Sequence, residues 1–156
     1  ILGVGDLAQA ILYLLVKEGV KDITITNRTY HKALEVQSVF DVNVINFEKK
    51  YLAAAENDVI ISATSAPHLV LTKEELLPLL KRDKKYTFLD LAMPRDIDSE
   101  LSSEENIDLF NLDDIWKVYN KNLKTRDELM ESYSFLIDKQ MINLKKWFQY
   151  YEERKI

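Results

Sequence analysis

The hydrophobic and polar positions of residues 1–112 alternate between two kinds of segment. Short apolar runs rich in β-branched residues predict strands at residues 22–26, 42–45, 58–62, 86–91 and 108–111. Residues 1–4 have the character of the end of another buried strand, and segments with helical spacing separate all of these runs. Strands that alternate with helices in this way form βαβ units, so the sequence predicts an α/β fold with a Rossmann-like, doubly wound parallel sheet.

The helical segments also indicate where helices begin and end and which side chains they bury. The apolar positions in the first two are Leu7, Ile11, Leu14, Leu15, Ala33, Val36 and Val39, and the last three are expected to face inward. Gly19 is expected to end the first helix and Thr29 to cap a second helix that runs to about Phe40. Thr72 with Glu75 has the spacing of a capping box at the start of a later helix.

The pattern changes at about Asp113, beyond which the chain contains no Pro or Gly. Apolar residues follow steps of three and four at Trp116, Tyr119, Leu123, Met130, Tyr133, Ile137, Leu144, Trp147 and Tyr151. A heptad pattern of this length predicts a long C-terminal α-helical extension. It favours packing against a second chain or a further domain over packing on its own domain. The sequence therefore predicts two regions, an α/β domain at 1–112 and a helical region at 113–156.

Composition excludes several classes of protein. The chain has 156 residues, 47% of them hydrophobic, no Cys and a net charge of −5. The absence of Cys rules out disulfides, a cysteine nucleophile and thiolate metal sites in this chain. No apolar run reaches about 18 residues and no export signal is visible, so we expect a cytoplasmic protein without a membrane span. Because the first residue is not Met and already belongs to a strand, we expect an N-terminal part to precede it.

The glycine-rich turn at the start is the first candidate for chemistry. Gly3, Val4, Gly5, Asp6, Leu7 and Ala8 form a GxGxxA string between a strand and a helix. Gly3 would allow the tight turn, Gly5 would let a pyrophosphate approach the backbone, and Ala8 would allow close helix–strand packing. The N–H groups of the helix start favour an anion there. The alternative is an ordinary βα turn, in which glycine pairs also occur.

The end of the second strand carries the next signal. In a dinucleotide fold the residues about 20 positions past the glycine turn meet the adenosine ribose, and an acidic residue there favours NAD. This chain has neutral Asn27 followed by Arg28 and Thr29. A guanidinium can bind a 2′-phosphate with two hydrogen bonds, so these residues favour NADP over a solvated surface arginine.

Two further segments follow strand ends on the same expected edge of the sheet. The stretch 62–67 contains Thr64 and Ser65, which suit a close approach to the cofactor, although a turn rich in Ser and Pro is the alternative. His68 is expected to be structural or exposed and not a metal ligand, because His31 is the only other histidine. Residues 90–98 place two acids and an arginine beside the cleft. They could hold a loop by salt bridges or contact the nicotinamide end, and the sequence leaves both possibilities open.

Taken together, these motifs resemble the NADPH-binding domain of glutamyl-tRNA reductases. The matching strings are GVGDLA at 3–8, NRT at 27–29, SATSAPH at 62–68, LDLAMPRDID at 89–98 and FNLDDI at 110–115. The long tail is similar to that family's dimerisation domain. Shikimate dehydrogenases share the NRT and ATSA strings and are the nearest alternative. Ala8 is a departure, since family members commonly have Gly there.

The resemblance implies roles for individual residues. It implies a pyrophosphate held by Gly3, Val4, Gly5, Asp6 and Leu7, and a 2′-phosphate end held by Asn27, Arg28 and Thr29. It places Thr64, Ser65, Ala92, Met93 and Pro94 on the nicotinamide side of NADPH, with no metal ion. No catalytic residue is expected in this chain, because that family's cysteine nucleophile belongs to an N-terminal domain.

The resemblance also implies a function for the full-length protein. The enzyme would reduce the glutamyl group of glutamyl-tRNA, held as a thioester, to glutamate-1-semialdehyde on the route to 5-aminolevulinate and tetrapyrroles. The chain alone is expected to be inactive. The implied partners are a second copy bound through the C-terminal helix, glutamyl-tRNA bound by the absent N-terminal domain, and the downstream aminomutase. The alternatives are another NADP-dependent dehydrogenase, of the shikimate or sirohaem-synthesis type, or a non-catalytic dimeric NADPH-binding module.

Overall fold

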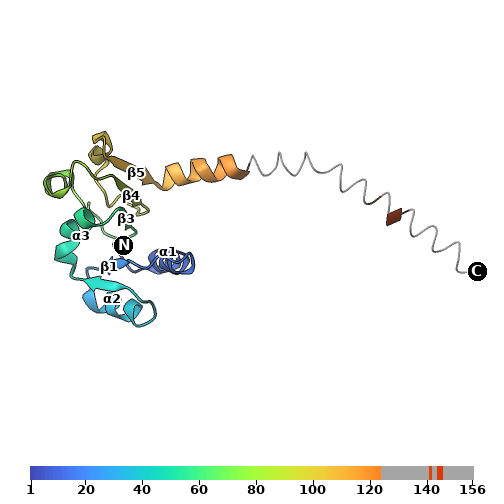
Figure 1. The fold of residues 1–156 in the computed structure, drawn as a ribbon, viewed down its shortest axis with the longest axis horizontal. Helices are drawn as coiled ribbons and strands as arrows, with labels where there is room; N and C mark the ends of the chain where they lie inside the picture. Colours follow the sequence, from blue (N-terminus) through green and yellow to red (C-terminus); the bar gives the residue numbers. More distant parts are fainter. Residues whose placement is uncertain (124–140, 142–143, 146–156) are drawn as a thin grey trace, which may run out of the picture. The chain divides into compact units, whose positions relative to one another are not determined.

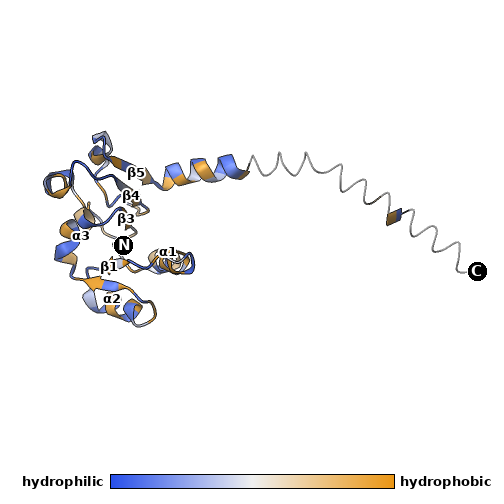
Figure 2. Ribbon diagram, in the orientation of Figure 1, coloured by the Kyte–Doolittle hydropathy of each residue, from blue (hydrophilic) through white to orange (hydrophobic). Residues whose placement is uncertain are grey.

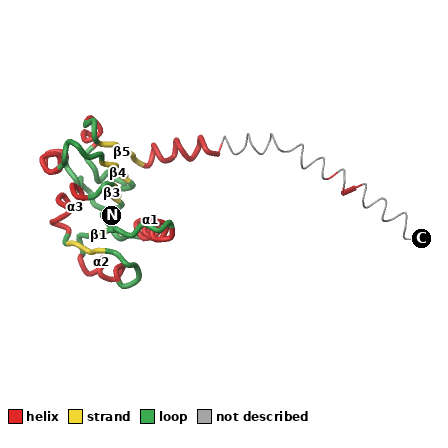
Figure 3. The backbone as a smooth tube through the Cα atoms, in the orientation of Figure 1, coloured by secondary structure: helices red, strands yellow, loops and turns green. Residues whose placement is uncertain are grey.

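A computed structural model describes residues 1–123, 141 and 144–145, and the chain divides into two units, Ile1–Leu112 and Asp113–Ile156. In the first unit, strands alternate with short helices (Figures 1 and 3). The α-helices are α1 (Asp6–Lys17), α2 (Tyr30–Gln37), α3 (Lys50–Glu56) and α4 (Lys73–Leu76). The strands are β1 (Thr24–Thr26), β2 (Asn43–Ile45), β3 (Val59–Ser62), β4 (Tyr86–Asp90) and β5 (Ile107–Asn111). The 3-10 helices are η1 (Phe47–Lys49), η2 (Leu77–Leu79) and η3 (Ser99–Ser103).

The strands form a parallel sheet whose centre is the N-terminal segment. β1 pairs with β2, and β3 pairs with β4, which pairs with β5. Leu2 bridges the two groups, because it pairs in parallel with Thr26 on one side and with Ser62 on the other. Its amide donates to Ile61 O at 2.8 Å, and the Ala63 amide donates to Leu2 O at 2.9 Å. The order is therefore β2, β1, the N-terminal segment, β3, β4, β5, which is the order of a Rossmann fold.

Two hydrophobic clusters share the core of this unit. One packs Leu12 of α1 and Ala33 of α2 around Ile25 of β1. The other packs side chains of α3 and α4 around β3 and β4, with Phe88 of β4 fully buried. Separate clusters of this kind are what a sheet covered by helices on both faces requires, so the prediction of an α/β Rossmann-like sheet is confirmed.

The helical faces predicted from sequence are partly wrong. Leu7 and Leu14 are 49% and 55% exposed, whereas Ala8 and Leu12 of the same helix are buried. The buried face of α1 is therefore centred one position further along the helix than the face with the most apolar side chains. Val39 is 75% exposed because α2 ends at Gln37, before the position at which a longer helix would have turned this side chain inward.

The predicted helix ends are also only partly right. Gly19 follows the C-cap of α1 with a φ of +84°, which is the left-handed conformation expected of a terminating glycine. Thr29 and Thr72 stand at the N-caps of α2 and α4, but neither side chain caps the backbone. The Thr72 hydroxyl instead donates to the Glu75 carboxylate at 3.4 Å, so the capping box does not form.

In the second unit, residues 113–123 are helical. Hydrophobic and hydrophilic positions alternate along this segment (Figure 2), and Ile115, Trp116, Val118 and Tyr119 are exposed. The rings of Trp116 and Tyr119 meet edge to face, with centroids 5.4 Å apart. Most of the predicted heptad positions beyond Leu123 lie outside the described residues. Among the described helices, none has the length and apolar character needed to cross a membrane.

Candidate functional site

A cavity of about 540 Å³ lies at the carboxyl ends of β1 and β3, beside the end of the N-terminal segment. The strand order reverses at this place, and open α/β sheets bind their ligands at such a switch point. The cavity brings together most of the predicted site residues, namely Gly3, Val4, Gly5, Asn27, Arg28, Thr29, Thr64 and Ser65.

The two glycines of the turn have different surroundings. Gly3 has a φ of +96°, and a Cβ there would lie 2.5 Å from the backbone oxygen of Ala63. The fold itself therefore requires glycine at position 3. Gly5 has an ordinary φ of −69°, and a Cβ there would meet no atom within 4 Å. Within the described part of the chain no contact demands glycine at position 5, and the open space beside it is where a ligand can approach the backbone.

Helix α1 points its first turn at this open space. Gly5 is the N-cap, and the first N–H groups of a helix have no partner inside it. These donors and the positive end of the helix dipole would favour an anion in this space. The side chain of Asp6 is exposed and does not line the cavity, so this turn presents backbone amides to the open space and no acidic side chain.

Cationic side chains reach the cavity from the turn after β1 and from the first turn of α2. Arg28 and Lys32 both line the cavity, and within the described part of the chain neither forms an ion pair. The Asn27 amide donates to Thr29 O at 2.9 Å and so shapes the turn that presents Arg28. Lys32 was not predicted as a site residue. Its position three residues past Thr29, in the first turn of α2, is the signal that could have identified it.

An aromatic wall closes another side of the cavity, and it too was missed from sequence. Phe47, Lys50 and Tyr51 line it, with the Lys50 ammonium 5.0 Å from the Phe47 ring centre and 4.4 Å from that of Tyr51. Burial, together with the Glu75 carboxylate, raises the pKa of the Tyr51 phenol. The phenol therefore stays protonated near neutral pH and serves as a hydrogen-bonding group.

The loop after β3 forms the remaining wall. Thr64 and Ser65 belong to it, and His68 lies farther along it as an exposed side chain that also lines the cavity. Among the described residues, no group of three or more His, Asp and Glu side chains is arranged to hold a metal ion.

The structure does not bring every predicted residue to this cavity. Asp6, Leu7 and the segment Ala92-Met93-Pro94 are absent from its lining. Met93 is 83% exposed, and the peptide bond between Met93 and Pro94 is cis. The segment 92–94 follows β4, whereas the cavity is lined by the glycine turn, the start of α2, residues of η1 and α3, and the loop between β3 and α4 with the first residues of α4.

Two of the three acids of the segment 90–98, Asp90 and Asp96, are buried and accept hydrogen bonds. The Asp90 carboxylate accepts from the backbone amides of Ala92, Asp96 and Ile97. The Asp96 carboxylate accepts from Ser62 and Thr64, on the loop that lines the cavity. Of the two possibilities left open by the sequence, Asp96 thus holds a loop, by hydrogen bonds to hydroxyl and amide groups.

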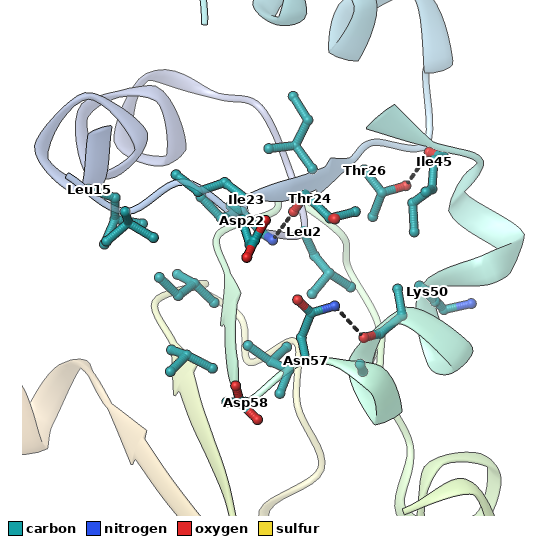
Figure 4. Close-up of a pocket in the computed structure, with 18 of the residues that line it drawn as sticks. Leu2, Leu15, Asp22, Ile23, Thr24, Thr26, Ile45, Lys50, Asn57 and Asp58 are labelled. Atoms are coloured by element: carbon teal, nitrogen blue, oxygen red, sulfur yellow. Dashed lines mark hydrogen bonds between the residues drawn. The ribbon is translucent and has the colours of Figure 1, made fainter. Parts of the chain in front are cut away.

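A second cavity, of about 500 Å³, lies along β1 and β3, beside α3 (Figure 4). The backbone nitrogen of Ile1 lies there and donates to Thr24 O at 2.7 Å.

Comparison with known proteins identifies the family of this chain. The family model described as shikimate / quinate 5-dehydrogenase matches residues 1–118. The chain is 52% identical over 153 residues to a glutamyl-tRNA reductase of Fusobacterium nucleatum subsp. nucleatum, covering 97% of this chain and 46% of that protein. It is 36% identical over 130 residues to a glutamyl-tRNA reductase of Solidesulfovibrio magneticus, covering 82% of this chain and 29% of that protein. The chain thus spans less than half the length of these curated relatives.

A solved structure agrees with the sequence relatives. Glutamyl-tRNA reductase from Methanopyrus kandleri superposes with a TM-score of 0.83 at 25% identity, over 99% of this chain and 39% of that one. The chain therefore belongs to the family described by the shikimate / quinate 5-dehydrogenase model, and within it corresponds to the NADP-binding domain region of glutamyl-tRNA reductases.

Proposed function

We propose that this chain binds NADPH and that the protein to which it belongs is a glutamyl-tRNA reductase. One observation carries the choice of NADPH. The cavity joins a glycine turn with open space at Gly5 to two cations, Arg28 and Lys32, that form no ion pair within the described residues. A pyrophosphate fits the first feature and a 2′-phosphate fits the second.

Different groups of the chain would bind different parts of the cofactor. Backbone amides at the start of α1 would bind the pyrophosphate, and Gly5 would let it approach closely. Arg28 and Lys32 would neutralise the 2′-phosphate, with Asn27 and Thr29 holding the turn. Thr64 and Ser65 would contact the cofactor from the loop after β3. Asp6, Leu7 and the segment 92–94 would complete the contacts along the pyrophosphate and nicotinamide side. The bound nicotinamide would supply the hydride.

In the full-length protein, this hydride would reduce the glutamyl group carried by tRNA to glutamate-1-semialdehyde, for tetrapyrrole synthesis. This chain contains no Cys, so a thioester with the glutamyl group cannot form on it. We propose that the chain holds the hydride donor and that another part of the protein holds the substrate. A shikimate-type dehydrogenase is the second candidate, because the family model carries that description, but both sequence relatives described above are glutamyl-tRNA reductases.

A nucleotide titration tests the proposed function. The quenching of protein fluorescence by NADPH and by NADH is measured under the same conditions, and NADPH is expected to bind at least about tenfold more tightly because of its charge-assisted phosphate contacts. Equal affinities, or no binding of either nucleotide, would overturn the assignment.

We further propose that the region 113–156 forms a long helix that pairs two copies of the chain. Support comes from the exposed Trp116 and Tyr119 and from the heptad spacing that continues beyond them. The 156-residue chain is expected to have the mass of a dimer by light scattering, and a chain ending at Leu112 the mass of a monomer. Monomers in both cases would contradict the pairing.

A further inference from the structure

Asp96 is a fully buried carboxylate that the proposed function does not use. Its relative exposure is 0%, and both of its oxygens are occupied. Oδ2 accepts from the Ser62 hydroxyl at 2.6 Å and from the Thr64 amide at 3.0 Å, and Oδ1 accepts from the Thr64 hydroxyl at 2.7 Å. Hydrogen bonds to a carboxylate are stronger than those between neutral groups, so these contacts fix the loop after β3 at its first residues.

The backbone of Asp96 is itself anchored on two sides. Its amide donates to the Asp90 carboxylate at 3.1 Å, which ties it to the end of β4. Its carbonyl accepts from the amides of Val70 at 2.6 Å and of Leu71 at 3.0 Å, which ties it to the far end of the same loop. Asp96 therefore holds both ends of the segment 62–71 and is itself held by the neighbouring strand.

Two contacts connect Asp96 to the cavity through Thr64. The Thr64 hydroxyl, while donating to Asp96, accepts from the Ala66 amide at 3.0 Å and so sets the turn that carries Ser65. Just before Thr64, the backbone oxygen of Ala63 lies against Gly3, where a Cβ would be only 2.5 Å away. A displacement of Thr64 would therefore move both the cavity wall and the neighbour of the glycine turn.

We propose that Asp96 is a positioning residue for the nucleotide site. It lines no part of the cavity, yet it holds Thr64 and Ser65 in the geometry that faces the cofactor. This inference rests on the proposed NADPH site. It assigns to Asp96 a part in cofactor affinity that acts through Thr64.

The test compares variants that remove or keep the Asp96–Thr64 contact. Asp96→Asn leaves the Thr64 hydroxyl without a carboxylate acceptor and is expected to raise the dissociation constant for NADPH about tenfold, as loss of a buried charge-assisted hydrogen bond does. Thr64→Val should have an effect of similar size, and the double variant should be little worse than either single one. Thr64→Ser keeps the hydroxyl that donates to Asp96 and should therefore weaken NADPH binding less than Thr64→Val does. Asp98→Asn is the matched control, because Asp98 belongs to the same segment but accepts from Lys73 and Glu100 instead.

A second measurement separates failure of this inference from failure of the proposed function. Hydrogen exchange of the Thr64 and Ala66 amides, without nucleotide, should accelerate in Asp96→Asn and stay unchanged in Asp98→Asn, with both variants folded by circular dichroism. If the parent chain binds NADPH and Asp96→Asn binds it equally well, or Asp98→Asn weakens binding as much, the positioning role is overturned. If the parent chain binds no nucleotide, the proposed function fails, and unchanged exchange in Asp96→Asn would remove the loop-holding role as well.

Discussion

Arg28→Ala is expected to abolish most of the preference for NADPH over NADH. The guanidinium lies at the cavity end of β1 and has no ion-pair partner among the described residues, so it is available to a 2′-phosphate. A charge-assisted contact of this kind contributes about 1.5–3 kcal/mol, so NADPH affinity should fall roughly 10- to 100-fold while NADH affinity stays nearly constant. Titration of both nucleotides against the parent and variant chains measures the effect.

The control for this experiment is another exposed arginine, Arg82, which lies in the turn before β4 and does not line the cavity. Arg82→Ala should leave both affinities unchanged. Lys32→Ala should also weaken the binding of NADPH. Its effect should be smaller than that of Arg28→Ala, because an ammonium group cannot form the paired contacts of a guanidinium. A loss of NADH affinity equal to that of NADPH in Arg28→Ala would show that this side chain acts on something other than the 2′-phosphate.

Replacing each of the two glycines of the turn with alanine should affect different properties: stability at position 3 and nucleotide binding at position 5. Gly3→Ala places a Cβ 2.5 Å from the Ala63 oxygen at a φ of +96°, so the free energy of unfolding should fall by about 3 kcal/mol. Gly5→Ala meets no protein atom within 4 Å and should change stability by less than about 1 kcal/mol. It should nevertheless weaken NADPH binding by at least about tenfold, because the new methyl group occupies space left for the pyrophosphate. Urea unfolding and nucleotide titration measure the two effects.

Gly19→Ala is the matched control for the conformational part of this result. Gly19 also has a positive φ, of +84°, but a Cβ there would meet nothing within 4 Å. Its substitution should cost only the backbone strain, about 1 kcal/mol. If Gly3→Ala were no more destabilising than Gly19→Ala, the close approach of Ala63 would not limit position 3. If Gly5→Ala bound NADPH normally, the pyrophosphate would not lie at this turn.

The sequence predicted the fold well because its signals are local. Each strand is a short apolar run, and the glycine turn at Gly3 and the terminating Gly19 both have the positive φ that their residue type suggests. The errors concern which side a helix buries. Leu7 and Leu14 are apolar at helical spacing but face outward, because the stripe containing Ala8 and Leu12 packs into the core. That choice depends on the position of the sheet, which no local pattern specifies.

The site could be predicted only where its residues are close in sequence. The strings around Gly3, Arg28 and Thr64 were recognisable one by one. The aromatic wall of Phe47 and Tyr51 was not, since it reaches the cavity only after β2 and α3 have been placed. The role of Asp96 was equally hidden, because a carboxylate that accepts from Ser62, 34 positions away, looks in the sequence like any loop acid.

The position of the N-terminal segment in the sheet has a consequence for the order of folding. Leu2 is hydrogen-bonded to Ile61 and Ala63 on one side, and Ile1 and Gly3 to Thr26 on the other, so this segment pairs fully only when both halves of the sheet are in place. The glycine turn cannot take its final shape until the chain through Ala63 has folded, and such long-range pairing is slow. A nucleotide would therefore bind only after the centre of the sheet has closed, and its binding would report completed folding of this domain.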